Sequence, residues 1–273
     1  MPRRPRTRSP RWRTRGVDVA PGVLLVHGAW HGAWCWNDGF AQRLEDRGIP
    51  AKAIDLRGHG EQNDGRRLNR HRMRHYADDV VTALRETDGP TVLVGHSMGG
   101  GVVQQVLARR DRPALGGAAL LASMPPAGVW RITLKIARQH PLRFLAANAT
   151  LDLGRLATTP DRARELFLSA DAPDALAEST ASRVHSESYL AFLDMLLLDR
   201  PRPRPIDEPV LIVGAERDEI FTPKEVAATA RAWGTEPVMV DTAHDVMLDA
   251  GWERVADLLA DWVLALASVD REM

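Results

Sequence analysis

The sequence predicts an α/β fold with a mostly parallel central sheet, helices on both faces of the sheet, and a helical insert that caps one edge. Short apolar runs alternate with segments of helical periodicity, and most of these runs are continuous instead of alternating with polar residues. Continuous apolar strands are typical of a parallel sheet that is covered on both faces. The insert is predicted because the alternation stops between residues 125 and 205 and resumes afterwards.

Six apolar runs are predicted to form the strands of this sheet. They lie at 23–26, 51–54, 91–94, 118–121, 210–213 and 237–240. Between and after them, apolar residues recur at helical spacing and predict helices at about 39–47, 75–87, 98–110, 223–233 and 252–267. Because strands and helices alternate, the helices are expected to cover both faces of the sheet.

The insert contains helical patterns and no clear strand. Its helices are expected near 132–147, 160–168, 174–183 and 188–198. The segment 200–205 alternates arginine and proline, which favours a stiff extended spacer back to the sheet; a linker without a mechanical role is the alternative. The predicted organisation is a core formed by 17–124 and 206–273, a helical cap or lid formed by 125–205, and an N-terminal arm, 1–16.

The N-terminal arm is strongly basic, although the whole chain has a net charge of zero. Residues 1–16 hold seven arginines and no acidic residue, which leaves 29 basic and 36 acidic residues, a net charge of −7, in the remainder. The arm lacks the apolar segment of a signal peptide and is predicted to be disordered. A polyanion-binding tail and an overextended translation start are alternatives. No nucleic-acid partner is expected, because arginine and proline supply charge but no side chains that recognise bases.

The composition favours a soluble protein of the cytoplasm. Hydrophobic residues make up 44% of the 273 residues, enough to form a sizeable core. No apolar run approaches the ~18 residues of a membrane span, so no membrane association is expected. The chain has one cysteine, Cys35, which excludes an intrachain disulfide and favours a thiol-tolerant compartment. The oligomeric state is left open.

Ser97 stands between two glycines, directly after one predicted strand and before a predicted helix. The chain must turn sharply there, and Gly95 and Gly99 remove the side chains that would collide in such a turn. A serine that only caps the helix is the alternative, but a cap needs no glycine two residues to either side. Ser97 is therefore predicted to be a nucleophile held at the end of the sheet.

A serine hydroxyl needs a base within hydrogen-bond reach and a third group that orients the base. His244 follows the last predicted strand and Asp218 follows the strand before it, so both lie in loops expected at the same sheet edge as Ser97. We predict that His244 is the base and Asp218 the orienting acid. Glu216 and Glu219 compete with Asp218 for this role, and a carboxylate that only caps the next helix is the alternative.

Two backbone N–H groups are predicted to form an oxyanion hole. Met98 follows the nucleophile, and Ala29 lies in the loop after the first strand, where Gly28 permits a close backbone approach. A simple strand-end turn is the alternative for this loop. Candidates for an apolar substrate pocket are Trp30, Trp130 and Phe221, whereas Trp34 and Trp36 are equally expected to pack against the following helix.

No metal site is predicted. His71 and His75 have the spacing of ligands on one helix face, but the run between them offers no acidic third ligand and is rich in cations.

The chain resembles the α/β-hydrolase superfamily over about residues 20–127 and 206–267. The motifs that carry the resemblance follow one another in the order expected: the His27-Gly28 loop, the segment Asp55-Leu-Arg-Gly-His-Gly60, the Ser97 turn, Asp218 and His244. The segment 27–36, His-Gly-Ala-Trp-His-Gly-Ala-Trp-Cys-Trp, is similar to the opening segment of the plant methylesterase and hydroxynitrile lyase group and of related bacterial serine hydrolases. The resemblance implies the α/β-hydrolase fold and a cofactor-free ester hydrolase.

Four positions depart from the families resembled. The lyases usually have threonine at the position of Ala29 and lysine at that of Asp245. Because a cation stabilises departing cyanide and an aspartate opposes it, lyase chemistry is disfavoured. Glu61 and Gln62 stand where a small polar residue is common, which puts the shape of that loop in doubt.

The leading hypothesis is a serine carboxylesterase that cleaves small to medium esters through an acyl-enzyme, with a small-molecule ester as its partner. A receptor-like protein that binds a small apolar ligand with vestigial turnover is the alternative from another class. A thioester or carbon–carbon hydrolase and a hydroxynitrile lyase use the same three residues and stay open. The acyl and alcohol groups of the substrate are not readable from the sequence.

Overall fold

The structure is a computed structural model that describes residues 21–63 and 67–272. The basic arm expected at 1–16 lies outside the described residues, so its predicted disorder stays a prediction.

The described residues form a six-stranded sheet in which every neighbouring pair is parallel. This confirms the predicted α/β fold class. The chain runs from β1 outward to β2 and then returns to β3 on the other side of β1, so the strand order reverses between β1 and β3. Sites in such sheets form at the carboxyl ends of the strands beside this reversal. The strands, in the order β2-β1-β3-β4-β5-β6 across the sheet, are Ala51–Ile54, Gly22–Val26, Thr91–His96, Gly117–Leu121, Val210–Ala215 and Pro237–Val240.

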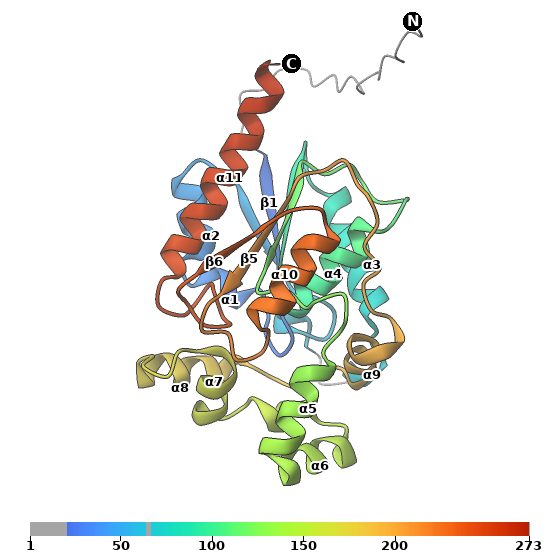
Figure 1. Cartoon of the computed structure of the whole chain (residues 1–273), viewed down its shortest axis with the longest axis vertical. Helices are drawn as coiled ribbons and strands as arrows, with labels where there is room; N and C mark the ends of the chain where they lie inside the picture. The colour runs from blue at the N-terminus through green and yellow to red at the C-terminus, as the bar shows by residue number, and fades with distance from the viewer. Residues whose placement is uncertain (1–20, 64–66, 273) are drawn as a thin grey trace, which may run out of the picture.

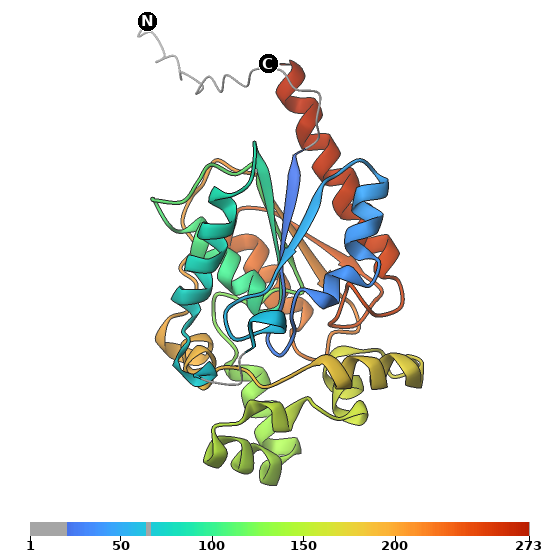
Figure 2. The same ribbon diagram turned by 180° about the vertical axis from the view of Figure 1, so that it is seen from behind.

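Helices cover both faces of the sheet (Figures 1 and 2). On one face lie α1 (Trp34–Asn37), α2 (Phe40–Asp46) and α11 (Trp252–Glu272), and on the other lie α3 (Met73–Arg85), α4 (Met98–Leu107) and α10 (Pro223–Ala232). Successive strand residues point to opposite faces, so Leu25 and Val94 pack in the first layer while Leu24 and Leu93 pack in the second. This two-sided burial explains the continuous apolar runs.

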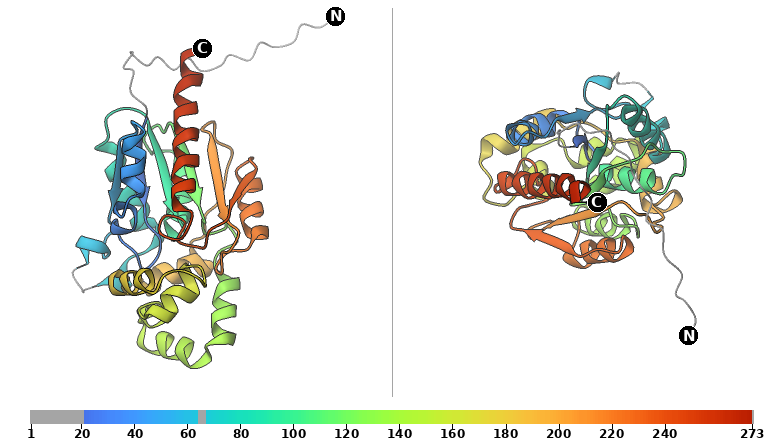
Figure 3. Two further views of the ribbon diagram at one scale, coloured as in Figure 1. Left: turned by 90° about the vertical axis from the view of Figure 1, so that its left-hand side faces the viewer. Right: turned by 90° about the horizontal axis from the view of Figure 1, so that it is seen from above.

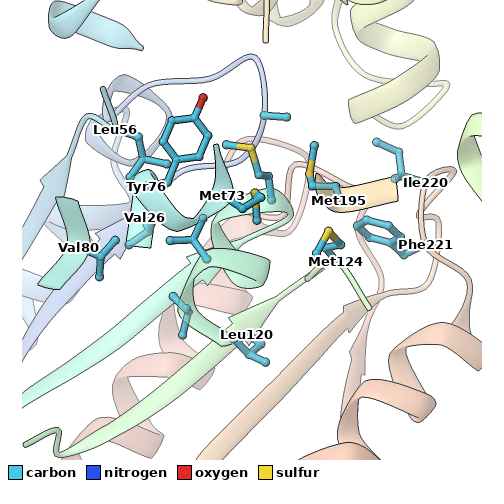
Figure 4. Packing of buried hydrophobic residues seen from close by; sticks show 14 of the residues in the cluster. Val26, Leu56, Met73, Tyr76, Val80, Leu120, Met124, Met195, Ile220 and Phe221 are labelled. Atoms are coloured by element: carbon cyan, nitrogen blue, oxygen red, sulfur yellow. The ribbon is translucent and has the colours of Figure 1, made fainter. Parts of the chain in front are cut away.

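The α3–α4 side of the core extends beyond the sheet. Figure 4 shows Leu120 of β4 and Met73 of α3 in the same cluster as Met124, Met195 and Phe221, which lie past the carboxyl ends of the strands. Apolar packing is therefore continuous from the sheet to the insert.

The insert is helical and lies beneath the carboxyl ends of the strands (Figures 1 and 3). It differs from the expectation at two places. The helix expected at 132–147 is two helices, because Pro141 begins a new helix and the residue before a proline, here His140, leaves the helical region. The helix expected at 188–198 is a short α-helix that continues as a π-helical turn. Its elements are α5 (Trp130–Gln139), α6 (Pro141–Thr150), η3 (Leu153–Leu156), α7 (Pro160–Phe167), α8 (Asp174–Arg183), α9 (Tyr189–Leu193) and η4 (Asp194–Leu198).

Asp194, the first residue of η4, connects the insert to the start of α3 by hydrogen bonds. Its buried carboxylate accepts hydrogen bonds from the Nε of Arg72, at 2.8 Å, and from the backbone N–H of Met73, at 3.1 Å. Two short 3₁₀ turns, η1 (Gly60–Gln62) and η2 (Leu68–Arg70), complete the described elements. Among the helices described, none combines the length and the apolar character needed to cross a membrane.

Candidate active site

Ser97 lies in the turn between β3 and α4 with backbone angles φ 52° and ψ −118°. A positive φ strains any residue that has a Cβ atom. A Cβ on Gly95 would lie 2.5 Å from the carbonyl oxygen of Gly99, and a Cβ on Gly99 would overlap the carbonyl oxygen of His27. Only glycine fits at 95 and 99, and the turn leaves the Ser97 side chain at the carboxyl end of β3, where it lines a cavity.

The structure brings Ser97, His244 and Asp218 together. The Nε2 of His244 lies 2.9 Å from the Oγ of Ser97, and its Nδ1 lies 2.9 and 3.0 Å from the two carboxylate oxygens of Asp218. Because an ionised carboxylate only accepts hydrogen bonds, Nδ1 carries the proton and Nε2 is free to accept from the serine hydroxyl. Glu219, a competitor for the role of Asp218, instead pairs with Lys135 at 2.5 Å.

The loop after β5 fixes the Asp218 carboxylate. Its Oδ1 accepts hydrogen bonds from the backbone N–H groups of Ile220, at 2.7 Å, and Phe221, at 3.0 Å. The carboxylate therefore orients His244 while its own position is held by two backbone donors.

Burial and charge act in opposite directions on His244. Burial by itself lowers the pKa of this histidine, but the Asp218 carboxylate, which accepts its hydrogen bond, and the nearby Asp245 carboxylate raise it, and the net pKa lies above the ordinary value of 6.5. A raised pKa makes the imidazole a better proton acceptor. In this arrangement the Nε2 of His244 can accept the proton of the Ser97 hydroxyl, and the Asp218 carboxylate stabilises the resulting imidazolium.

Ala29 and Met98 both line the cavity beside Ser97. Met98 is the first residue of α4, so its N–H belongs to the first turn, whose N–H groups have no partner within the helix. The Ala29 loop packs against the nucleophile, since a Cβ on Gly28 would come within 3.0 Å of the Ser97 Cβ. The two N–H groups thus belong to segments that border the nucleophile.

The cavity at Ser97 is small and almost entirely apolar, with a volume of about 70 Å³. Of the predicted pocket residues, Trp30 and Phe221 line it, and the Nε1 of Trp30 donates a hydrogen bond to the carbonyl of Leu153. Trp130 departs from the expectation: its side chain is 52% exposed and does not belong to the lining. The reason is geometric, because Val129, which precedes α5, and Ile132 of α5 line the cavity instead.

Three residues that neighbour the predicted site residues in the chain form hydrogen bonds between the loops of the site. The sequence did not predict these contacts. The Nε2 of His96 donates to the carbonyl of His244 at 2.9 Å. The buried carboxylate of Asp245 lies 3.0 Å from the Nε2 of His31, whose Nδ1 donates to the carbonyl of Ala29 at 2.8 Å. The signal available in the sequence was adjacency, since His96 precedes Ser97 and Asp245 follows His244.

Another buried histidine–carboxylate pair, His59 with Glu187, joins the core to the insert. The Nε2 of His59 lies 2.8 Å from Glu187, which also accepts from the hydroxyl of Tyr76 at 2.9 Å. Burial lowers the pKa of His59, but the Glu187 carboxylate outweighs it and raises the net pKa. Burial raises the pKa of Glu187, but His59 outweighs it and lowers the net pKa. The pair is therefore stabilised in its charged form.

Among the described residues, no three histidine, cysteine, aspartate or glutamate side chains are grouped so that they could hold a metal ion. The Nδ1 of His75 instead accepts a hydrogen bond from the backbone N–H of Arg72 at the start of α3.

Comparison with known proteins adds a family match over most of the chain. A profile of the alpha/beta hydrolase family matches residues 23–258. The chain is 38% identical over 78 residues to a pyrethroid hydrolase of Sphingobium wenxiniae, covering 29% of this chain and 27% of that protein. It is 40% identical over 81 residues to methylesterase 3 of Arabidopsis thaliana, covering 29% of this chain and 30% of that protein. The aligned region thus spans less than a third of each relative.

The fold match extends much further than the sequence matches. The solved structure of a pyrethroid hydrolase from Sphingobium faniae superposes with a TM-score of 0.64 at 23% identity, and the match covers 91% of this chain and 99% of that one. At this identity the likeness concerns the fold, which includes the helical insert as well as the sheet.

Proposed function

Because the chain belongs to the alpha/beta hydrolase family, we propose that it is a cofactor-free serine hydrolase that cleaves small to medium carboxylic esters through an acyl-enzyme. The observation that carries the proposal is the unbroken series of contacts from Asp218 through His244 to Ser97, each at 2.9 to 3.0 Å. Relatives named as a pyrethroid hydrolase and a methylesterase support ester cleavage.

In the first half-reaction, the Oγ of Ser97 attacks the ester carbonyl while its proton moves to the Nε2 of His244. The Asp218 carboxylate stabilises the imidazolium that forms. The N–H groups of Ala29 and Met98 donate hydrogen bonds to the negatively charged carbonyl oxygen, and one such donor is worth roughly 3 to 4 kcal/mol of barrier. When the tetrahedral intermediate collapses, His244 gives its proton to the leaving alcohol.

In the second half-reaction, water attacks the acyl group on Ser97 and gives a proton to His244. The new tetrahedral intermediate collapses, His244 returns the proton to the Oγ of Ser97, and the carboxylic acid leaves. The three side chains are then restored, and one water has been consumed for each ester cleaved.

The position after the catalytic histidine bears on the lyase alternative. Asp245 is fully buried, faces His31 and does not line the cavity at Ser97. The position therefore offers neither a cation for departing cyanide nor a side chain in the cavity, and ester hydrolysis is the better supported reaction.

The proposal is tested by labelling the purified chain with a fluorophosphonate and locating the added mass by peptide mass spectrometry. We expect the label on Ser97, with steady multiple turnover of p-nitrophenyl acetate that Ser97→Ala abolishes. A single turnover followed by retention of the product would point to the receptor-like alternative. Absence of both the label and turnover would refute the proposal.

A further inference from the structure

The loop that follows β1 carries Ala29, one of the two proposed oxyanion donors, and its backbone is strained. The N–H of His31 donates to the carbonyl of Gly28 at 3.4 Å, which closes a turn over residues 28–31. Trp30, the third residue of this turn, has a φ of 66°, whereas Ala29, the second, has no positive φ. These angles are typical of a type II turn, whose third residue is usually glycine. A tryptophan there is strained, because its Cβ disfavours a positive φ.

Two kinds of turn compete at residues 28–31. In a type I turn the φ of the third residue is about −90°, which a tryptophan adopts without strain. The ψ of the second residue is about −30° in a type I turn and about 120° in a type II turn, so the peptide between Ala29 and Trp30 is rotated between the two. The direction of the Ala29 carbonyl therefore distinguishes them. A group that binds this carbonyl in its present direction stabilises the strained turn.

The side chain of His31 is such a group. Its Nδ1 donates to the Ala29 carbonyl at 2.8 Å. The ring is buried and held by its neighbours, because it stacks on Trp34 at a ring separation of 5.1 Å and lies edge-on to the ring of Phe167 at 5.0 Å. A ring held in this way cannot follow the carbonyl to the other side of the turn. Rotation of the peptide to the type I turn would therefore break this hydrogen bond.

Asp245 fixes the protonation of His31. The Nε2 of His31 lies 3.0 Å from the buried Asp245 carboxylate. A carbonyl oxygen only accepts, so Nδ1 carries a proton, and beside an ionised carboxylate Nε2 carries one as well. Burial by itself raises the pKa of Asp245, but His31, with His96 and His244 nearby, outweighs burial, and the net pKa lies below the ordinary value. The pair is thus an imidazolium and a carboxylate, and the Nδ1 of His31 always has a proton to donate.

The same pair joins the loop of the base to the loop of the oxyanion donor. Asp245 directly follows His244, and Ala29 lies two residues before His31. Neither His31 nor Asp245 is among the residues that line the cavity at Ser97. They therefore act through the groups that they hold and not by touching the substrate.

We propose that His31 and Asp245 are positioning residues of the oxyanion hole: their pair holds the Ala29 carbonyl, selects the strained turn, and thereby keeps the Ala29 N–H where it donates to the oxyanion. The inference rests on the proposed ester hydrolysis and adds to it two residues outside the cavity.

The experiment separates the two nitrogens of His31. An asparagine places its amide nitrogen where His31 has Nδ1, and a glutamine places its amide nitrogen where His31 has Nε2. Both substitutions are made together with Asp245→Asn, so that no unpaired charge is buried. His31→Asn can then still donate to the Ala29 carbonyl, whereas His31→Gln can bond only to position 245. Asp245→Asn alone is the reference, because its neutral amide can still donate to the Nε2 of His31.

The readout is a preference that depends on the oxyanion hole. It is the ratio of kcat/KM for p-nitrophenyl acetate to kcat/KM for its thiono analogue, in which sulfur replaces the carbonyl oxygen. Sulfur is larger and accepts hydrogen bonds weakly, so an intact pair of donors favours the oxygen ester. We expect this ratio to fall at least about tenfold in the His31→Gln variant and to stay within about threefold of the reference in the His31→Asn variant. KM for p-nitrophenyl acetate should stay within about threefold in both.

Two further substitutions test the turn and the acid separately. Trp30→Gly lets the third residue of the turn adopt a positive φ without strain, so in this background the two His31 variants should differ by no more than about threefold. Asp245→Ala removes the partner of His31, so its ratio should fall at least about threefold below that of Asp245→Asn. A difference that persists with Trp30→Gly would overturn the selection of the turn, and equal ratios in the two Asp245 variants would overturn the role of Asp245.

Equal ratios in the two His31 variants, or a lower ratio in His31→Asn, would overturn the inference while leaving ester hydrolysis intact. Asp218→Asn and His140→Gln are controls. The first impairs the base and should slow both esters alike, and the second removes a partly exposed histidine that pairs with Glu165 at 2.6 Å and should change neither rate. If the reference cleaves no ester and Ser97 takes no label, ester hydrolysis itself is refuted, and this inference with it.

Discussion

Two of the buried histidine–carboxylate pairs in the described part of the chain can be compared directly, one at the candidate active site and one between the core and the insert. His244 lies 2.9 Å from Asp218, and His59 lies 2.8 Å from Glu187. Both histidines have a raised pKa. The pairs differ in what meets the second ring nitrogen: for His244 it is the hydroxyl of Ser97 at 2.9 Å, and for His59 it is the carbonyl of Arg57 at 3.2 Å.

That difference separates chemistry from structure. A hydroxyl can give up its proton, so the Nε2 of His244 can be unprotonated at first and then take the proton of Ser97 during a reaction. A carbonyl only accepts, so the Nδ1 of His59 must keep its proton while Nε2 faces Glu187. His59 therefore has no nitrogen free to act as a base. Neither a short distance to a carboxylate nor a raised pKa identifies a catalytic histidine; its other neighbour does.

The largest effect is expected from Asp218→Asn. Without the carboxylate, His244 is no longer held in the tautomer that presents an empty Nε2 to Ser97, and kcat should fall about 10⁴-fold. The measurement is steady-state hydrolysis of p-nitrophenyl acetate. A loss below about tenfold would show that Asp218 does not orient the base.

The second largest effect is expected on the stability of the fold, from substitution of Glu187. Glu187→Gln leaves His59 buried without its counter-charge, which should reduce the free energy of unfolding by about 3 to 5 kcal/mol, measured by urea denaturation. The kcat of the folded variant should stay within about twofold of the original. Asp261→Asn, at a 70% exposed carboxylate paired with Arg47, is the control and should change stability by less than about 1 kcal/mol. If kcat falls together with stability, the two pairs are not functionally separate.

The same pair predicts how stability depends on pH. The pKa of His59 is raised on folding, so its contribution is complete below about pH 6.5 and is lost as pH rises through the raised value. The pKa of Glu187 is lowered on folding, so its contribution is complete above about pH 4.5 and is lost as pH falls through the lowered value. The stability difference between the original chain and Glu187→Gln should therefore be larger at pH 5.5 than at pH 8.5. An equal difference at both pH values would contradict the charged state of the pair.

A smaller change is expected in the pH profile of activity. The base must be neutral, so kcat/KM should rise with pH through the pKa of His244, at a midpoint above the ordinary 6.5. Asp245 contributes to raising that pKa, so Asp245→Asn should move the midpoint to lower pH, with less than about a tenfold change at the plateau. Asp241→Asn removes a 68% exposed carboxylate from the same loop and should leave the midpoint in place. A profile that moves equally in both variants would exclude a specific role for Asp245.

The smallest effect is expected outside both pairs. Trp130 is half exposed and does not line the cavity at Ser97, so Trp130→Ala should change the free energy of unfolding by no more than about 0.5 kcal/mol and leave KM unchanged. A clear rise in KM for p-nitrophenyl acetate would return Trp130 to the substrate site.

The sheet and the elements around Ser97 were predictable because their signals are local. The six apolar runs match the six strands to within two residues at each end. In the four inner strands, burial on both faces leaves few positions for a polar residue to interrupt a run. The turn at Ser97 is marked by glycines on both sides. Asp218 and His244 could be predicted at the sheet edge because they lie three and four residues after the ends of β5 and β6, and parallel strands end at one edge.

The remaining contacts depend on tertiary structure and have no local signal. His59 and Glu187 are separated by 128 positions in the chain, and His31 and Asp245 by 214. No spacing rule connects such residues. Which residues near α5 face the cavity is set by how the insert packs on the core, so the sequence placed Trp130 in the pocket, whereas Val129 and Ile132 line it. Cavity volumes follow from the packing of the insert and could not be estimated from composition.

The lining of the cavity at Ser97 has an evolutionary consequence. Most of its apolar residues come from the insert, whereas Ser97, His244 and Asp218 come from loops at the ends of strands. Substrate range can therefore diverge by exchange of the insert without loss of the reaction. Any transplanted insert must still dock on the same recipient surface, so a functional chimera should retain the acids at 187 and 194 that engage His59, Tyr76 and Arg72.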